Sequence, residues 1–246
     1  MLDYLHLPAS TIANKIITKN IFELADISNS DKKMLIQDVA RIVWEHRIAP
    51  DNSNIRAVCN DTIDYSEIQI IRIDLKQRAH VARISNLILS SFQYPLLLVF
   101  NDSGESLFVA AHVHINQNDR SRLVVEKSIR TEWMCLDDVG CLFDITKMRT
   151  SNMYDLYDDI FNVIVRIRAE NKVHLDRELS SEEYKLIDST ISEIDSQIAT
   201  LRSILKNEDQ FNRQMELNNQ IKTLQLSKRK FIQDVTNNGH NQQQSD

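Results

Sequence analysis

Residues 180–206 read SSEEYKLIDSTISEIDSQIATLRSILK, and this stretch decides the architecture of the last third of the chain. Its large apolar residues recur at spacings of 4, 3, 4, 3 and 4, which is typical of the a and d positions of a coiled coil. These residues are Ile187, Ile191, Ile194, Ile198, Leu201 and Leu205. Because so narrow a stripe stabilises a helix only when another helix covers it, we predict that these six residues bind a partner helix, within the chain or in another protein.

The residues on either side of this stripe predict where the helix begins and where it ends. Ser180 and Glu183 have the spacing of a capping box, which marks a helix start. A second 4-3 stripe runs from Leu217 to Val235, out of phase with the first and separated from it by the polar residues 207–210. Two arrangements fit: an antiparallel hairpin that turns at the break, or one long helix with a stutter. The Asn- and Gln-rich residues 237–246 predict a disordered tail.

The remainder of the chain predicts an α+β fold. Residues 1–178 are expected to form a head domain with a small mixed sheet of about four strands flanked by helices, and residues 179–236 a coiled-coil or hairpin extension. Two β-branched strands, beginning near Ile68 and Pro95, are separated by a helix over 81–92, which implies a parallel pair joined by a right-handed crossover. A turn at 101–104 then leads into a hairpin strand over 107–115, and residues 123–134 are expected to extend the sheet.

Two helices are predicted before the sheet and one after it. The first runs from Ser10 or Thr11 to about Ala25. The second follows Ser28 and ends near Arg47, and the last covers about 154–168.

Composition excludes several classes of protein. Only 3 Gly and 3 Pro occur in 246 residues, which argues against Gly-rich phosphate loops and tightly turned all-β folds. The net charge of −6 gives no overall attraction to nucleic acid. The three cysteines form no zinc or disulfide pattern, and the sequence predicts neither a signal peptide nor a membrane span. We therefore expect a cytoplasmic protein without a resident cofactor.

The sharpest catalytic candidate is a nuclease site of the PD-(D/E)xK type. Asp74-Leu75-Lys76 lies at the end of a predicted buried strand and before a helix, as that class of site requires. Asp61, Asp64 or Glu67 could supply the second carboxylate, with Asp64 named as the candidate, so that two acids would hold Mg²⁺ and Lys76 would orient the attacking water. Against this hypothesis, a three-residue motif is common by chance, and the strand near Pro95 carries no acid before its turn.

Two further sets of residues carry weaker hypotheses. His112 and His114 have a spacing compatible with a metal, but the sequence suggests no third ligand. A basic cluster near the C-terminus is a candidate contact for nucleic acid, although positive charge near a helix end is also favoured by the helix dipole. The cluster comprises Lys228, Arg229 and Lys230.

Several stretches together resemble a bacterial family, domain of unknown function 4391. They include Leu7-Pro8, Asn14-Lys15 with Lys19, Trp44–Pro50 with Asn54-Ile55, residues 67–76, Tyr94-Pro95-Leu96, and Lys206–Asn212 with Glu216-Leu217-Asn218. The resemblance carries no assigned activity. Members of that family often sit beside DNA methyltransferases and helicases in restriction-like or defence loci, which implies an accessory role near DNA processing.

These observations support three hypotheses of function. The first is an accessory protein-interaction subunit of a restriction-like or anti-phage assembly, which associates through its C-terminal helices with a methyltransferase, a helicase or a second copy of itself. The second is a Mg²⁺-dependent nuclease using Asp74 and Lys76, and the third is a DNA-binding module.

Overall fold

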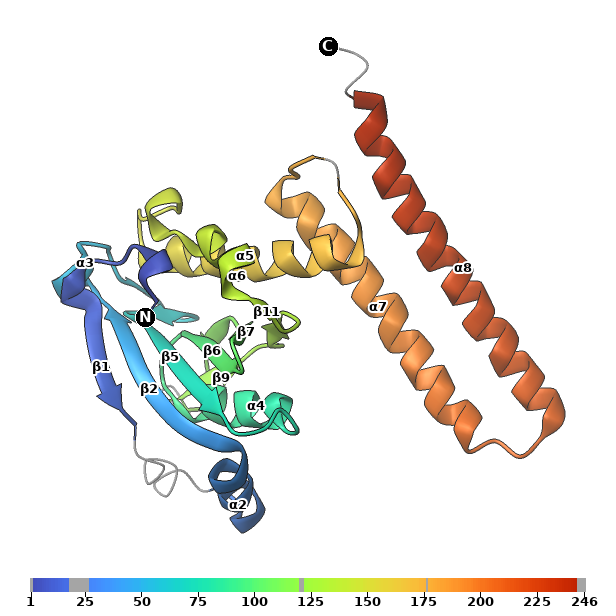
Figure 1. Cartoon of the computed structure of the whole chain (residues 1–246), viewed down its shortest axis with the longest axis horizontal. Helices are drawn as coiled ribbons and strands as arrows, with labels where there is room; N and C mark the ends of the chain where they lie inside the picture. Colours follow the sequence, from blue (N-terminus) through green and yellow to red (C-terminus); the bar gives the residue numbers. More distant parts are fainter. Residues whose placement is uncertain (1, 18–26, 120–121, 176, 243–246) are drawn as a thin grey trace. The chain divides into compact units, whose positions relative to one another are not determined.

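The computed structural model of the protein describes residues 2–17, 27–119, 122–175 and 177–242. The chain divides into two compact units, Met1–Ile164 and Val165–Asp246. The first unit holds the β-sheets. The second holds the end of α6 (Met153–Lys172) and the long helices α7 (Ser181–Lys206) and α8 (Phe211–Gln242) (Figure 1). None of the helices in the described ranges is long and apolar enough to cross a membrane.

A mixed sheet of seven strands forms the centre of the first unit. Its order is β1-β2-β5-β6-β7-β10, and β11 also pairs with β7. The strands are β1 Ile12–Ile16, β2 Val39–Ile48, β5 Ile68–Leu75, β6 Leu96–Asp102, β7 Glu105–Ala110, β10 Ile129–Arg130 and β11 Met134–Cys135. The predicted mixed sheet is confirmed, but it is larger than the four strands expected from the sequence.

Smaller elements surround this sheet. Two hairpin sheets pair β3 (Val58–Cys59) with β4 (Asp64–Tyr65) and β8 (Val113–Ile115) with β9 (Leu123–Val125). The short helices are α2 Asn29–Asp38, α3 Pro50–Ser53, α4 Val81–Ser91 and α5 Leu136–Val139, with 3-10 turns at Asp3–Leu5, Ala9–Thr11, Gly140–Phe143 and Ile145–Lys147. The strand predicted over 107–115 is therefore two strands, β7 and β8, which belong to different sheets.

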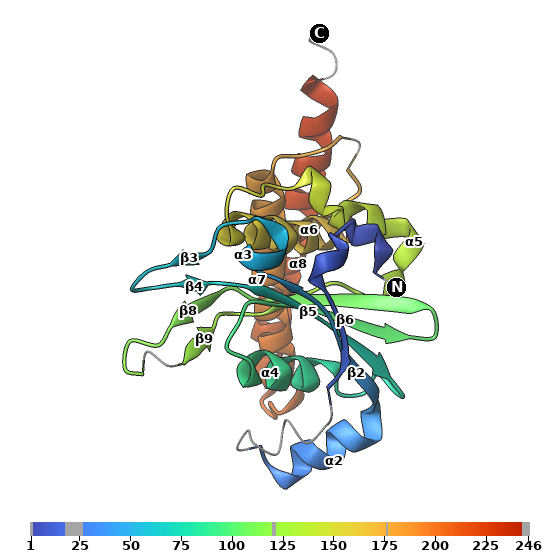
Figure 2. The same cartoon turned by 90° about the vertical axis from the view of Figure 1, so that its left-hand side faces the viewer.

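The central strand β5 shows why the sheet lies between two layers. It runs parallel to β6, and α4 connects the two, as the sequence predicted. Ile71, Ile73 and Leu75 of β5 are buried in one apolar cluster with side chains of α2 and α4. Figure 2 shows α2 and α4 on one side of the sheet, and α5 with the beginning of α6 on the other. Because both faces of the sheet are covered, every residue of β5 except Asp74 is buried.

The N-terminal helices are the main error of the sequence prediction. Residues 12–16 form β1, and residues 18–26 of the first predicted helix lie outside the described residues. The second predicted helix ends at Asp38, and the following ten residues are β2, which pairs antiparallel with β5. Two register shifts in β2 interrupt its period-2 alternation, so Val39, Ile42 and Val43 take a spacing that also fits one face of a helix.

The junction between α2 and β2 is held by a buried carboxylate. The Asp38 side chain is fully buried and accepts hydrogen bonds from Gln77 Nε2 and, at 2.6 Å, from His80 Nδ1. The backbone N–H of Lys76 donates to the Asp38 carbonyl at 2.7 Å. Burial alone would raise the pKa of Asp38, but the hydrogen bonds from Gln77 and His80 outweigh it and lower that pKa. The carboxylate thus links α2 to the segment between β5 and α4.

We predict that Asp38→Asn lowers the free energy of unfolding at pH 7 by about 1.5–3 kcal/mol, because charge-assisted hydrogen bonds at a buried site are lost. Since the folded pKa of Asp38 is lowered, its contribution is present above the unfolded pKa of about 3.9 and is lost as the pH falls through the folded value. Urea unfolding at pH 7 and below pH 4 should show the two proteins converging in acid. Asp234→Asn, at an exposed position, is the control, and an equal loss in both variants would contradict the role of Asp38.

Candidate functional site

The second unit contains a helical hairpin. At the start of α7, Ser180 Oγ accepts from the Glu183 N–H at 3.3 Å and Glu183 Oε2 accepts from the Ser180 N–H at 2.8 Å, which is the predicted capping box. α7 ends at Lys206 and α8 begins at Phe211, and the two helices pack side by side (Figure 1). Of the two arrangements left open by the sequence, the structure has the hairpin. α8 continues to Gln242, through the first part of the predicted disordered tail, and residues 243–246 lie outside the described residues.

The six apolar residues of the predicted α7 stripe, called the seam from here on, are covered to different extents within this unit. Ile187, Ile191 and Ile198 are at most 5 % exposed, whereas Ile194, Leu201 and Leu205 are half-buried. On α8, Leu217 and Ile221 of the second stripe are also buried. The buried residues of the two stripes thus lie on helices that pack against each other. Contact of the six seam residues with another protein stays a prediction.

Covering the seam leaves other apolar surface on the hairpin. A groove of about 690 Å³ lies between α7 and α8, with Leu201 and Leu224 among uncharged polar side chains and Glu216. Ten large apolar side chains are exposed in the described part of the chain, and five of them lie on these two helices. Those five are Leu186, Ile204, Phe211, Met215 and Leu226.

One residue of the basic cluster forms an ion pair, and the other two are exposed. Lys228 Nζ contacts both carboxylate oxygens of Asp195 on α7, at 2.6 and 2.7 Å, and so ties the two helices together. Arg229 and Lys230 are exposed on α8. Only part of the cluster is therefore available for the predicted contact with nucleic acid.

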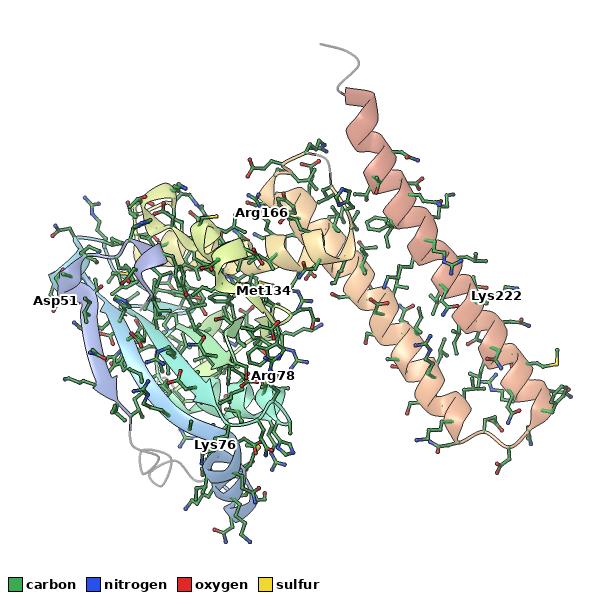
Figure 3. All side chains as sticks on the ribbon, viewed as in Figure 1. Asp51, Lys76, Arg78, Met134, Arg166 and Lys222 are labelled. Carbon is green, nitrogen blue, oxygen red and sulfur yellow. The ribbon has the colours of Figure 1, made fainter. Side chains whose placement is uncertain are left out.

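The structure separates the candidate nuclease residues. Asp64 in β4 precedes β5 and accepts from Cys59 Sγ and the Ser66 N–H, each at 3.0 Å. Asp74 lies near the other end of β5, and an eight-residue strand is about 26 Å long. Lys76 follows β5 (Figure 3), and its Nζ donates to the Ile36 carbonyl of α2 at 2.9 Å. Asp64 is therefore not brought to Asp74, and Lys76 is engaged by backbone.

A carboxylate that sequence analysis missed shares an arginine, Arg72, with Asp74. Glu45 lies on β2, beside β5, and its Oε1 accepts from Arg72 Nε at 2.5 Å. Nη1 of Arg72 contacts both carboxylate oxygens of Asp74, and Arg41 donates to Asp74 Oδ2 from Nε at 3.1 Å. The Arg72 side chain is 5 % exposed and that of Glu45 is 10 % exposed. Glu45 was missed because the apolar spacing of residues 39–47 predicts a helix, which conceals its place next to β5.

This polar network is arranged for ion pairing. Burial would lower the pKa of Arg72, but the hydrogen bonds and charges of Glu45 and Asp74 outweigh it and raise that pKa. A guanidinium thus lies between the two carboxylates, where a Mg²⁺ site would need the ion. Among the described residues, no group of three His, Cys, Asp or Glu side chains is placed to hold a metal. The residues as arranged do not fit Mg²⁺.

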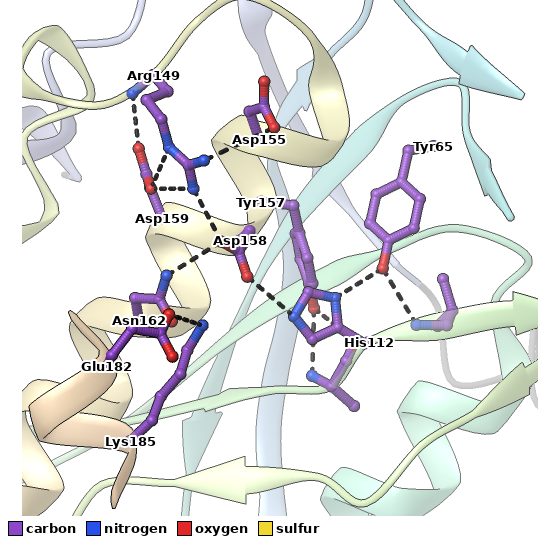
Figure 4. Close-up of polar contacts among 12 residues, drawn as sticks. Tyr65, His112, Arg149, Asp155, Tyr157, Asp158, Asp159, Asn162, Glu182 and Lys185 are labelled. Carbon is purple, nitrogen blue, oxygen red and sulfur yellow. Dashed lines mark hydrogen bonds and ion pairs between the residues drawn. The ribbon is translucent and has the colours of Figure 1, made fainter.

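The two histidines have different partners. His112 lies just before β8, with Nδ1 2.9 Å from the Tyr65 hydroxyl and Nε2 3.6 Å from Asp158 Oδ1 (Figure 4). Its ring packs against that of Phe161, with centroids 4.5 Å apart. His114 instead lies 3.6 Å from Glu126. The contacts of His112 with Asp158 and Tyr65 thus link α6, β4 and the segment just before β8.

Comparison with known proteins identifies a family. A family model described as "Domain of unknown function (DUF4391)" matches residues 5–227, which is most of the chain. This match confirms the resemblance predicted from the sequence. No curated protein and no solved structure gives a significant match.

We predict that Arg72→Met lowers the free energy of unfolding by about 3–5 kcal/mol, because it leaves the Glu45 carboxylate buried without its partner. Arg41→Met is the matched control: Arg41 is half exposed, and its ion pair with Asp74 is worth about 0–1 kcal/mol. Urea unfolding of both variants measures the difference. Combining Glu45→Gln with Arg72→Met should restore part of the loss, and equal effects at Arg72 and Arg41 would contradict the assignment.

Proposed function

Since the chain belongs to the DUF4391 family, whose description assigns no activity, we propose a function from the geometry of its second unit. The chain acts as a protein-interaction subunit in the cytoplasm. Its C-terminal helices bind a DNA methyltransferase, a helicase or a second copy of the chain within a bacterial restriction-like or anti-phage assembly. The family resemblance supports the choice of partners in this proposal, and the exposed residues of the hairpin support the proposed binding surface.

The observation that carries the proposal is the apolar surface left after the hairpin has closed. The seam uses the buried side chains of both stripes, yet five large apolar residues of α7 and α8 are still exposed. Exposed apolar residues that form a contiguous patch are typical of binding surfaces, whereas singly scattered ones are ordinary. Phe211 and Met215 are four residues apart on α8, a spacing at which helical side chains are neighbours. Phe and Met are also enriched where proteins bind one another.

The alternatives have less support from the geometry. A nuclease would need Mg²⁺ where Arg72 now bridges Glu45 and Asp74. A DNA-binding module would have only part of the basic cluster free, because Lys228 is paired with Asp195. Both hypotheses stay predictions.

The nuclease hypothesis predicts that Asp74→Ala or Lys76→Ala abolishes Mg²⁺-dependent cleavage of plasmid DNA. Absence of cleavage by the wild-type chain would contradict the nuclease hypothesis.

The interaction proposal predicts a stable complex of the full chain. Co-expression with the methyltransferase or the helicase of the same locus, followed by purification through a tag on this chain, should recover the partner in a fixed stoichiometry. Light scattering on the chain alone tests the second-copy option through its mass. A monomeric mass together with no co-purified methyltransferase or helicase would contradict the proposal.

A double variant, Leu186→Asp with Ile204→Asp, tests whether α7 contributes to binding of the partner. Both side chains are exposed on α7, so the fold should survive while recovery of the partner falls. Ser189→Asp with Ser203→Asp adds the same charge at exposed positions of the same helix and is the control. Circular dichroism confirms that both variants keep their helices.

A further inference from the structure

α8 carries a second stripe that faces away from the hairpin seam. Seven residues recur at spacings of 4, 3, 4, 4, 3 and 4, and every one of them is exposed. They are Phe211, Met215, Asn218, Lys222, Leu226, Arg229 and Gln233. At about 100° per residue, this stripe lies roughly 140° around the helix from the seam that begins at Leu217. Figure 3 shows Lys222 on the side of α8 away from α7.

The chemistry of the stripe is apolar and basic. Phe211 is 70 %, Met215 52 % and Leu226 55 % exposed, so the apolar members are largely uncovered. Lys222 and Arg229 lie on either side of Leu226, and no acidic residue belongs to the stripe. Within the described part of the chain, neither of these two cations forms an ion pair, whereas Lys228 and Arg213 of the same helix are paired with Asp195 and Glu216.

We infer that this outer face of α8 is part of the docking surface of the proposed interaction, and that its occupant is an acidic amphipathic helix of the partner protein. The inference rests on the proposed function and names the surface and the chemistry of the partner. Charge complementarity argues for acid on the other side, since two uncompensated cations flank the central leucine. The stripe is one residue wide and about 33 Å long, which suits a single helix of about 22 residues laid along it.

Two other anionic surfaces fit less well. A nucleic-acid backbone would pair with Lys222 and Arg229 but would leave Phe211, Met215 and Leu226 facing charged phosphate and water. An anionic membrane would take the apolar residues, but it would also have to accept Asn218 and Gln233 on the same face. A partner helix satisfies every position of the stripe when its apolar residues meet Phe211, Met215 and Leu226, its acids lie opposite Lys222 and Arg229, and its polar side chains lie opposite Asn218 and Gln233.

The direct test uses two synthetic helical peptides of about 22 residues with the same leucine stripe, one flanked by Glu and the other by Lys. Fluorescence anisotropy with the full chain should show binding of the Glu peptide alone, with an affinity that falls as salt rises. Lys222→Glu with Arg229→Glu should weaken that binding by at least about tenfold. Met215→Ser with Leu226→Ser should weaken it while leaving the salt dependence in place.

Arg202→Glu, at an exposed position of α7, is the control for added charge and should bind the Glu peptide as the wild type does. Several outcomes would overturn the inference: equal binding of both peptides, no binding of either, or insensitivity to the α8 variants. Tighter binding of a DNA duplex of about 20 base pairs or of phosphatidylserine vesicles through Lys222 and Arg229 would assign the face to phosphate instead.

The same α8 variants separate this inference from the proposed function. If the methyltransferase, the helicase or a second copy binds the wild type and still binds the Lys222→Glu, Arg229→Glu protein equally well, the interaction proposal stands and the outer face is wrong. If the Glu peptide binds through the stripe but none of those proteins associates with the chain, the surface is correct and the proposed assembly is wrong.

Discussion

The constraint on which the C-terminal unit depends is that a narrow apolar stripe cannot remain in water. α7 has such a stripe, and a single helix offers no means of burying it. The structure meets this constraint within the chain, because α8 turns back and packs along α7, with Leu217 and Ile221 of α8 buried. The Lys228–Asp195 ion pair then links the two helices across the hairpin. Closure of the seam determines which residues stay outside and can meet another molecule.

The first unit is organised by a related constraint on charge. β5 is buried on both faces, yet it carries Arg72 near its centre. A buried guanidinium is tolerated only when its hydrogen bonds are satisfied, and Glu45 from β2 and Asp74 from β5 satisfy them. The pairing fixes how β2 sits beside β5. It also occupies two carboxylates that would otherwise be available to a metal.

Sequence reasoning succeeded where structure follows from local pattern and failed where it follows from pairing. Three features could be recognised from residues that lie close together in the sequence. They are the capping box at Ser180, the two helical stripes, and the strand–helix–strand order that forms the parallel β5–β6 pair. The strand β2 was predicted as a helix because its two register shifts give the apolar residues a helical spacing. Missing β2 also concealed Glu45, whose role depends on the neighbouring strand. The choice between a hairpin and one long helix could not be made either, since it depends on how well one stripe covers the other.

The outer stripe of α8 was missed for a different reason. It has three large apolar residues among seven, so the seam that begins at Leu217 dominates any interpretation of the helix by hydrophobicity alone. Its significance appears only when the seam residues are known to be covered, because exposure then distinguishes Phe211, Met215 and Leu226 from the apolar side chains that hold the hairpin together. A helix that only had to close a hairpin would have no need of apolar side chains on the opposite face, where water favours polar ones. α8 therefore has two faces that carry apolar residues. One packs in the hairpin and stabilises the unit, and the other is exposed and, in our proposal, binds the partner helix.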